Sequence, residues 1–222
     1  LRAAVAYSWQ RLPDGARTVL LRASAFRGAF PRAAAAAVAG ADAAALAALV
    51  DASLLDLDED GRYRLHPVVA DFARDRLESR PSLAAATLRR HRRWFVSRLA
   101  EWRARMGGGP EQRDVVQAFG RELSDLWQAW NEAVAADRAA ELYALARTVA
   151  MYFELAHRFR EGADVLARSE AQLVRSNPAH VAALGALDAC WAWHHLRRGS
   201  LDAARERART AVETLSEHGD VE

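Results

Sequence analysis

The residues that could do chemistry in this chain are histidines, carboxylates and one cysteine, because the sequence contains no lysine. All 31 basic side chains are arginine, which excludes a Schiff-base lysine, an ammonium general base and the lysine of a phosphate-binding loop. Cys190 is the only cysteine, so intramolecular disulfides and cysteine-based metal sites are excluded. No nucleophile-elbow or paired-carboxylate spacing occurs, and we expect no catalysis by this chain.

Four histidines could suggest a metal site: His157, His180, His194 and His195. Adjacent residues on a helix point in directions about 100° apart, so the last two cannot face one ion together. No carboxylate stands four positions after either of them. The sequence therefore predicts no metal site.

Aromatic side chains are frequent in the C-terminal half of the chain, at Trp127, Trp130, Tyr143, Tyr152, Phe153, Trp191 and Trp193. We expect most of them to pack helices against each other. Aromatic side chains on the inner helices of a solenoid also anchor ligands and peptides. Tyr152, Trp191 and Trp193 are our candidates for such a partner-binding groove.

The charge balance argues against a nucleic-acid-binding protein. The formal net charge is only +2, and the pI of about 9.1 reflects a small excess of arginine. The best basic cluster, residues 89–93 beside Trp94 and Phe95, could stack on bases. Because consecutive helical residues point around the helix, we interpret it as a solvated arm with Trp94 packed inward.

Short, punctuated elements occupy residues 1–77. Hydrophobic spacing and capping residues predict helices at 4–12, 16–25, 32–38, 43–52 and 68–77. Residues 54–57 and 62–65 flank the acidic turn 58–61, which predicts a β-hairpin. Helices, a hairpin and a further helix indicate a winged-helix-like module.

Direct DNA contact by this module is not expected. The helix before the wing contains no arginine, and both of its charges, Asp42 and Asp51, are negative. The tip of the wing carries three more acidic residues at 58–60, which would repel phosphates. A DNA-binding regulator therefore stays the weakest alternative.

Long amphipathic helices predominate after residue 82 and predict an α-solenoid. We expect helices at 83–105, 112–136, 138–157, 160–175, 179–197 and 200–217. A tetratricopeptide-like pattern of a turn residue and two small residues occurs twice, at His157, Gly162 and Ser169, and at Gly199, Ala204 and Ala211. The predicted fold is mainly α, with a winged-helix domain at 1–78 and tetratricopeptide-like helix pairs at 79–222.

Several segments resemble the winged-helix and repeat regions of bacterial STAND-class signalling ATPases and regulators of the NB-ARC, AfsR and LuxR types. The similar segments are residues 24–30, 49–55, 61–67, 90–95 and 122–133, although Asp125 or Leu126 stands where asparagine is usual. The resemblance implies an upstream nucleotide-binding domain that binds ATP and ADP. It also implies a superhelical sensor that binds a protein, a peptide or a small-molecule inducer.

The resemblance also assigns a role to His66, which falls where related winged helices place a histidine on the β-phosphate of ADP. Pro67 replaces the aspartate that usually follows. Alternatively, His66 ends a strand and packs locally. The implied function is the regulatory and sensor part of a signal-transducing ATPase or transcriptional regulator, with no cofactor of its own.

A stand-alone interaction scaffold is the alternative function. Because the chain starts at Leu1 rather than methionine, we expect it to be part of a longer protein. Its apolar stretches are short and alanine-rich, and no signal segment opens it, so we expect a cytoplasmic protein without a membrane partner.

Overall fold

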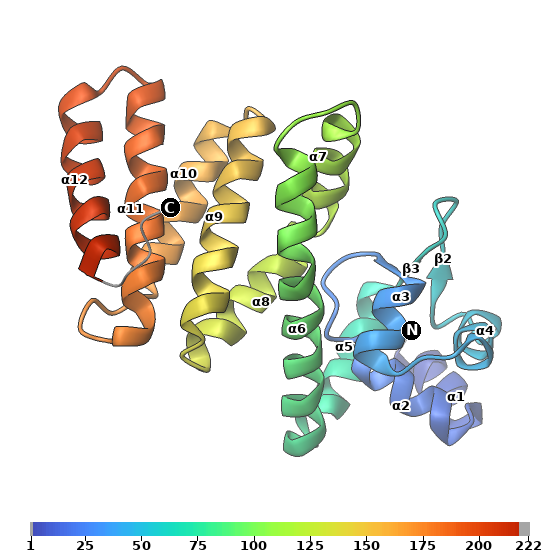
Figure 1. Cartoon of the computed structure of the whole chain (residues 1–222). Helices are drawn as coiled ribbons and strands as arrows, with labels where there is room; N and C mark the ends of the chain where they lie inside the picture. Colours follow the sequence, from blue (N-terminus) through green and yellow to red (C-terminus); the bar gives the residue numbers. More distant parts are fainter. Residues whose placement is uncertain (1, 218–222) are drawn as a thin grey trace. The chain divides into compact units, whose positions relative to one another are not determined.

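The computed structural model describes residues 2–217 and is mainly helical, with one small sheet (Figure 1). The chain divides into two compact units, Leu1–Phe95 and Val96–Glu222. Helix α6 (Pro81–Met106) runs through the point of division. The predicted fold class, a winged helix followed by helical repeats, is confirmed. The domain boundary placed at residues 78 and 79 stays a prediction.

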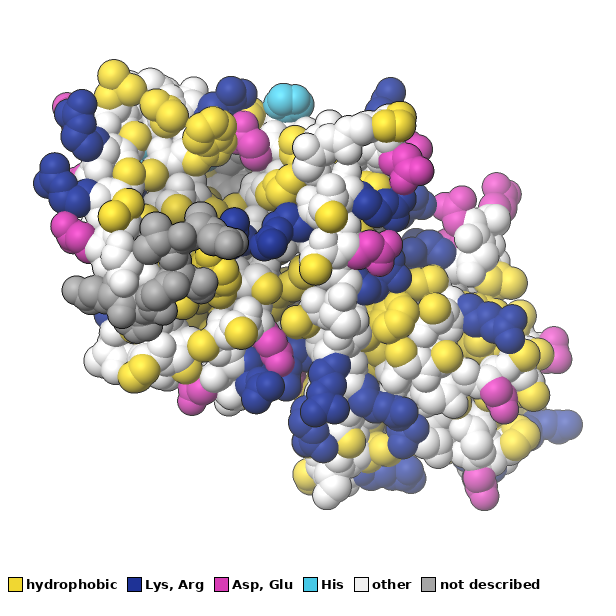
Figure 2. Space-filling model, viewed as in Figure 1, with side chains coloured by type: hydrophobic (Ala, Val, Ile, Leu, Met, Phe, Trp, Pro, Cys, Tyr) yellow, Lys and Arg dark blue, Asp and Glu magenta, His cyan; other side chains and the backbone are white. Residues whose placement is uncertain are grey.

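The first unit contains all the elements predicted for the winged helix. They are α1 (Arg2–Arg11), α2 (Asp14–Ala23), β1 (Phe30–Pro31), α3 (Arg32–Ala34), the π-helical turn η1 (Ala35–Ala39), α4 (Ala43–Asp51), β2 (Asp56–Leu57), β3 (Arg62–Arg64) and α5 (Pro67–Glu78). Asp42 caps α4 by accepting a hydrogen bond from the Ala45 amide at 2.7 Å. Gly61 has φ +72°, as the predicted hairpin turn requires. Figure 2 shows acidic side chains at the tip of this hairpin.

The sheet has one more strand than the sequence predicts. Its order is β1-β3-β2, and Phe30 lies opposite Tyr63 in an antiparallel pair. Pro31 directly precedes the helix predicted at 32–38, but proline is also tolerated on an edge strand, where its missing N–H costs no ladder bond. A strand of two residues is too short to show the alternating hydrophobic pattern of a strand, which explains why the sequence did not predict it.

An aromatic cluster lies in the core of this unit and corrects our interpretation of the arginine-rich segment. Phe26 stacks on Phe30 with ring centroids 4.1 Å apart, and Phe95 and His91 close the cluster from α6. His91 and Phe95 are buried, as is Arg92, whereas Trp94 is only half-buried. The inward face of this segment is therefore formed by residues other than Trp94.

The second unit consists of the end of α6 and six further helices. They are α7 (Gln112–Arg121), α8 (Leu123–Ala135), α9 (Ala139–Leu155), α10 (Phe159–Ala171), α11 (Pro178–Arg197) and α12 (Leu201–Glu217). Helices α9 and α10 form one pair, α11 and α12 form the next, and α11 packs on both α9 and α10 (Figure 1). The single helix predicted over 112–136 is wrong, since it is divided at Glu122, whose amide donates to the Phe119 carbonyl.

The predicted repeat positions are confirmed by the backbone. His157 and Gly199, 42 residues apart, both adopt left-handed conformations, with φ of +54° and +76°, in the turns of the two helix pairs. The small residues that follow each turn are buried: Gly162, Ser169, Ala204 and Ala211. Small side chains at these positions allow the helices of a pair to approach closely.

Gly162 shows how close this approach is. A Cβ at this position would lie 2.9 Å from Cβ of Phe153, on the facing helix α9. Gly120 makes a similar space for Tyr152, whose hydroxyl oxygen would lie 2.7 Å from an added Cβ. Large aromatic rings of α9 therefore pack directly against glycine backbone on both sides.

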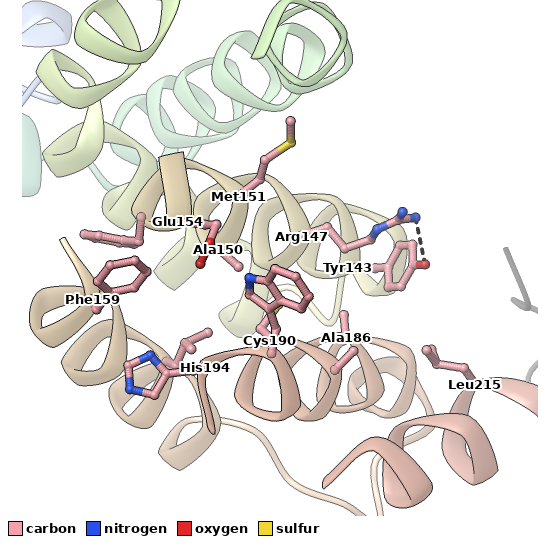
Figure 3. A pocket seen from close by; sticks show the side chains of 15 residues that line it. Tyr143, Arg147, Ala150, Met151, Glu154, Phe159, Ala186, Cys190, His194 and Leu215 are labelled. Atoms are coloured by element: carbon pink, nitrogen blue, oxygen red, sulfur yellow. Dashed lines mark hydrogen bonds between the residues drawn. The ribbon is translucent and has the colours of Figure 1, made fainter. Parts of the chain in front are cut away.

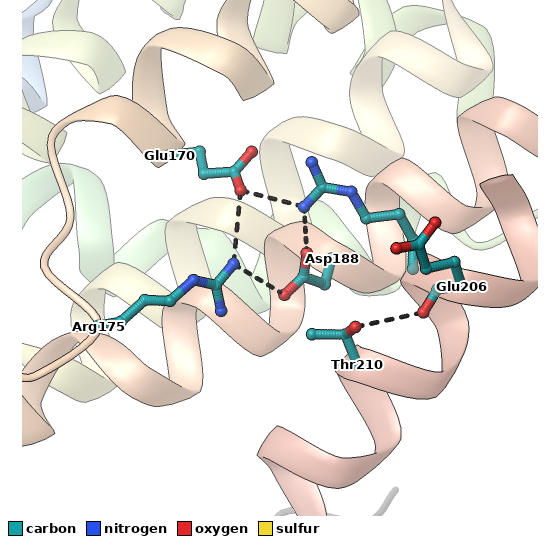
Figure 4. Close-up of polar contacts among 6 residues, drawn as sticks. Glu170, Arg175, Asp188, Glu206 and Thr210 are labelled. Atoms are coloured by element: carbon teal, nitrogen blue, oxygen red, sulfur yellow. Dashed lines mark hydrogen bonds and ion pairs between the residues drawn. The ribbon is translucent and has the colours of Figure 1, made fainter.

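An ion-pair network joins the two helix pairs (Figure 4). Asp188 of α11, which is 1% exposed, pairs with Arg207 of α12 and with Arg175, which precedes α11, at 3.6 Å. Glu170 of α10 pairs with the same two arginines, at 3.0 and 3.6 Å. A buried carboxylate needs such partners, so the network fixes how α10, α11 and α12 meet.

Gly162→Ala tests the close packing of the first helix pair. The added methyl group meets a Cβ atom that cannot rotate away, so we expect the free energy of unfolding to fall by about 1–3 kcal/mol. Gly15→Ala is the control, because Gly15 lies in α2 with no atom within 4 Å of an added Cβ. It should leave stability unchanged or slightly raised. Urea denaturation followed by circular dichroism measures both, and equal shifts would contradict the packing argument.

Candidate functional site

The candidate site is a cavity of about 350 Å³ bounded by α9, α10 and α11 (Figure 3). Most of its wall is apolar, with aromatic and aliphatic side chains from all three helices: Tyr143, Met151, Phe153, Phe159, Leu166 and Trp193. Its volume lies in the range of sites for small molecules, which are typically apolar with a few polar groups. The polar groups of the wall therefore decide what the cavity can bind.

Two charged side chains of α9 line the cavity, and their surroundings differ. The guanidinium of Arg147 donates a hydrogen bond to the Tyr143 hydroxyl at 3.0 Å and lies over its ring, 5.3 Å from the centroid. Glu154 forms an ion pair with Arg197 of α11 at 3.4 Å. Glu154 thus has a countercharge, whereas Arg147 contacts a neutral phenol.

His194 of α11 is the most deeply buried polar side chain of the cavity wall, 7% exposed. Its Nε2 is buried and has no hydrogen-bond partner among the residues that the structure describes. Burial lowers the pKa of His194, and the charges of Arg198 and His195 lower it further against an opposing effect of Glu154. The imidazole is therefore neutral near pH 7 and presents one unsatisfied nitrogen, a costly arrangement in a protein interior.

Cys190 also lines the cavity, and its environment makes it unreactive. Burial raises the pKa of its thiol to about 12, although the nearby charge of Arg147 acts in the opposite direction. The reactive form of cysteine is the thiolate, which this environment disfavours. Cys190 therefore behaves as a small neutral wall residue.

The three aromatic residues predicted to bind a partner lie in different environments. Trp193, 49% exposed, lines the cavity. Trp191 is half-buried and stacks on His195, and its indole nitrogen is buried without a hydrogen-bond partner within residues 2–217. Tyr152, 3% exposed, packs on Phe119 and accepts a hydrogen bond from Arg158 at 2.7 Å. The structure does not bring them together in one groove, and their binding role stays a prediction.

A second apolar groove, of about 610 Å³, lies between α11 and α12 and shares Trp193 with the cavity. Several of its large apolar residues are exposed, including Leu196, Leu201 and Val212. The two sites follow the 42-residue repeat, because Arg147, Met151, Glu154, Phe159, Gly162 and Leu166 in the cavity correspond to Ala189, Trp193, Leu196, Leu201, Ala204 and Ala208 in the groove.

This correspondence is the signal that could have identified the cavity residues from sequence. Arg147, Glu154 and Phe159 were missed because each is unremarkable alone, and His194 was considered only as a metal ligand. Once the groove face of one repeat is known, the 42-residue shift gives the face of the other. The repeat register therefore carries more functional information than any local motif here.

His66, the predicted nucleotide sensor, lies in the winged-helix unit at the start of α5. Its Nδ1 accepts a hydrogen bond from the Val68 amide at 3.3 Å, so it caps the helix, and its side chain is exposed. In the neutral form this leaves the hydrogen on Nε2, directed away from the helix terminus. His66 is thus a surface cap rather than a core residue, and its sensor role stays a prediction.

Residues 2–217 contain neither a metal-ligand cluster nor a single membrane-spanning helix. No cluster of three or more histidine, cysteine or acidic side chains in this range could hold a metal ion. No single helix in it is long and apolar enough to cross a membrane, and only the bent pair 32–39 and 43–51 meets those criteria in combination.

The N-terminal unit matches a known domain family. Residues 8–85 match the family model of the MalT winged helix domain. A solved Signal Transduction ATPase with Numerous Domains (STAND) protein with a tetratricopeptide repeat sensor, from Pyrococcus horikoshii, is similar with a TM-score of 0.40 and 14% identity. The similarity covers 96% of this chain and 33% of that one, so the chain spans about a third of its length. No curated protein matches the chain.

The pKa of His194 predicts a pH effect on stability. Because its folded-state pKa lies below the unfolded value of about 6.5, the unfolded chain takes up more protons as the pH falls. The stability that neutral His194 contributes is thus present above pH 6.5 and decreases below it. We expect the difference in unfolding free energy between pH 7.5 and 5.5 to be smaller in His194→Gln. His157→Asn, at an exposed turn where asparagine tolerates the positive φ, should retain the full difference.

Proposed function

We propose that this chain is the regulatory and sensor part of a STAND-type ATPase or transcriptional regulator. A ligand in the helical-repeat unit would be detected there, and the winged helix would relay the event to a nucleotide-binding domain of the parent protein. The observation that carries the proposal is the MalT-type winged helix at residues 8–85, followed in the same chain by a helical-repeat unit with a cavity. The chain itself would perform no catalysis, and the ATP or ADP would bind the nucleotide domain.

The cavity supplies the physical requirement of a sensor. A ligand shifts an equilibrium between two states only if it binds them with different affinity. The cavity wall is shared by α9, α10 and α11, so any change in how these helices meet changes the site. A ligand that fits one arrangement therefore stabilises that arrangement of the helix pairs.

His66 would form the other end of the relay. Its Nδ1 is engaged in capping α5, so its Nε2–H can donate a hydrogen bond to a phosphate oxygen of ADP. The exposed position at the start of α5 supports this role. Signal arrival would separate His66 from the phosphate and allow nucleotide exchange.

A stand-alone interaction scaffold is the second candidate, favoured by the exposed groove between α11 and α12. The two functions differ in one observable property of the coding sequence before Leu1. A lysine-bearing phosphate loop encoded there supports the ATPase regulator, and its absence supports the scaffold.

Two substitutions at His66 test the relay in the full-length parent protein. His66→Ala removes both the helix cap and the phosphate donor, whereas His66→Asn retains a good capping side chain and removes the imidazole. If His66 holds ADP, both variants should release it about tenfold faster or more, as expected for the loss of a hydrogen bond to a charged group.

Release of labelled ADP, measured beside the melting temperature of each variant, distinguishes the two roles of His66. A purely capping role predicts a lower melting temperature for His66→Ala, a normal one for His66→Asn, and ordinary ADP release from the latter. Unchanged ADP retention in both variants would remove His66 from the proposed relay.

A further inference from the structure

Resting on the proposed function, we propose that the cavity between α9, α10 and α11 binds a small organic monoanion. The ligand has an apolar or aromatic body that lies against Phe153, Phe159 and Trp193, and one carboxylate group that meets the guanidinium of Arg147. Two features of the cavity support this ligand: the charge balance of its wall and its apolar lining.

The charge balance favours an anion. Arg147 and Glu154 are the charged residues among those lining the cavity, and they do not pair with each other. Glu154 is neutralised by Arg197, while no carboxylate pairs with Arg147 in the described part of the chain. Cys190 and His194 of the wall are neutral near pH 7, because burial raises the pKa of the thiol and lowers the pKa of the imidazole. One positive charge is therefore left over, and an arginine guanidinium matches a carboxylate in geometry.

The apolar wall determines the rest of the ligand. Aromatic rings from all three helices surround the cavity, and its volume of about 350 Å³ suits a small molecule rather than a folded segment. Burying an apolar or aromatic body against these rings is favourable, whereas a strongly polar body would lose hydration without regaining hydrogen bonds. The site thus selects amphipathic acids with a single charged group.

Isothermal titration calorimetry measures binding directly, because the buried Cys190 thiol is too unreactive to report occupancy by chemical modification. Three probes of similar size isolate the effect of charge: 3-phenylpropionate, 3-phenylpropanamide and 3-phenylpropylammonium. The measurement uses the full 222-residue chain, and each probe is titrated into it at constant pH.

We expect 3-phenylpropionate to bind with about tenfold higher affinity than the amide, and the ammonium to bind most weakly. Arg147→Met should remove the preference for the carboxylate and leave the affinity for the amide unchanged. Arg160→Met is the matched control on the exposed surface of α10, outside the cavity wall, and should keep the wild-type preference.

Three outcomes would overturn the proposal: equal affinity for carboxylate and amide, highest affinity for the ammonium, or binding of none of the probes. An equal loss of preference in Arg160→Met would do so as well, because the effect would then be one of overall charge. Each of these results concerns the chemistry of the cavity. The relay through His66 is tested separately by ADP release, so failure of one is distinguishable from failure of the other.

Discussion

Close contact between helices at small side chains is the constraint on which the C-terminal unit depends. Phe153 packs against the backbone at Gly162, and the same arrangement recurs where Leu215 of α12 lies against Gly185 of α11. Because interiors are packed to crystal-like density, these contacts fix the separation of the helices within a pair. The ion pairs of Glu170 with Arg207 and Arg175 then join one pair to the next. Together the two kinds of contact set the dimensions of the cavity.

The cavity wall is therefore held by close helix contacts, but not all of its polar side chains are paired. Its aromatic wall is held by the same helix contacts that define the repeat, whereas Arg147 lacks a carboxylate partner and His194 lacks a hydrogen-bond partner within the described residues. Natural proteins seldom leave buried polar atoms unsatisfied without a reason. The unpaired charge of Arg147 in an apolar cavity of a repeat protein is what a ligand site requires.

Much of the fold could be predicted from the sequence, because helical periodicity, caps and turn residues are local signals. The hairpin with Gly61 and the turns at His157 and Gly199 followed from them directly. Features determined by tertiary packing could not be predicted in this way. The strand at Phe30 and the separation of Tyr152 from Trp193 depend on contacts between residues distant in sequence.

His157 and Asp137 occupy left-handed turns although neither is glycine. For residues with a side chain this conformation costs roughly 1–2 kcal/mol, a cost that glycine avoids, as at Gly199. Substitution of either residue by glycine would therefore raise the free energy of unfolding, and this possibility is open to evolution. A lineage of this protein can thus change its cavity wall to recognise a new ligand, tolerate the loss of stability, and restore it at a turn far from the site.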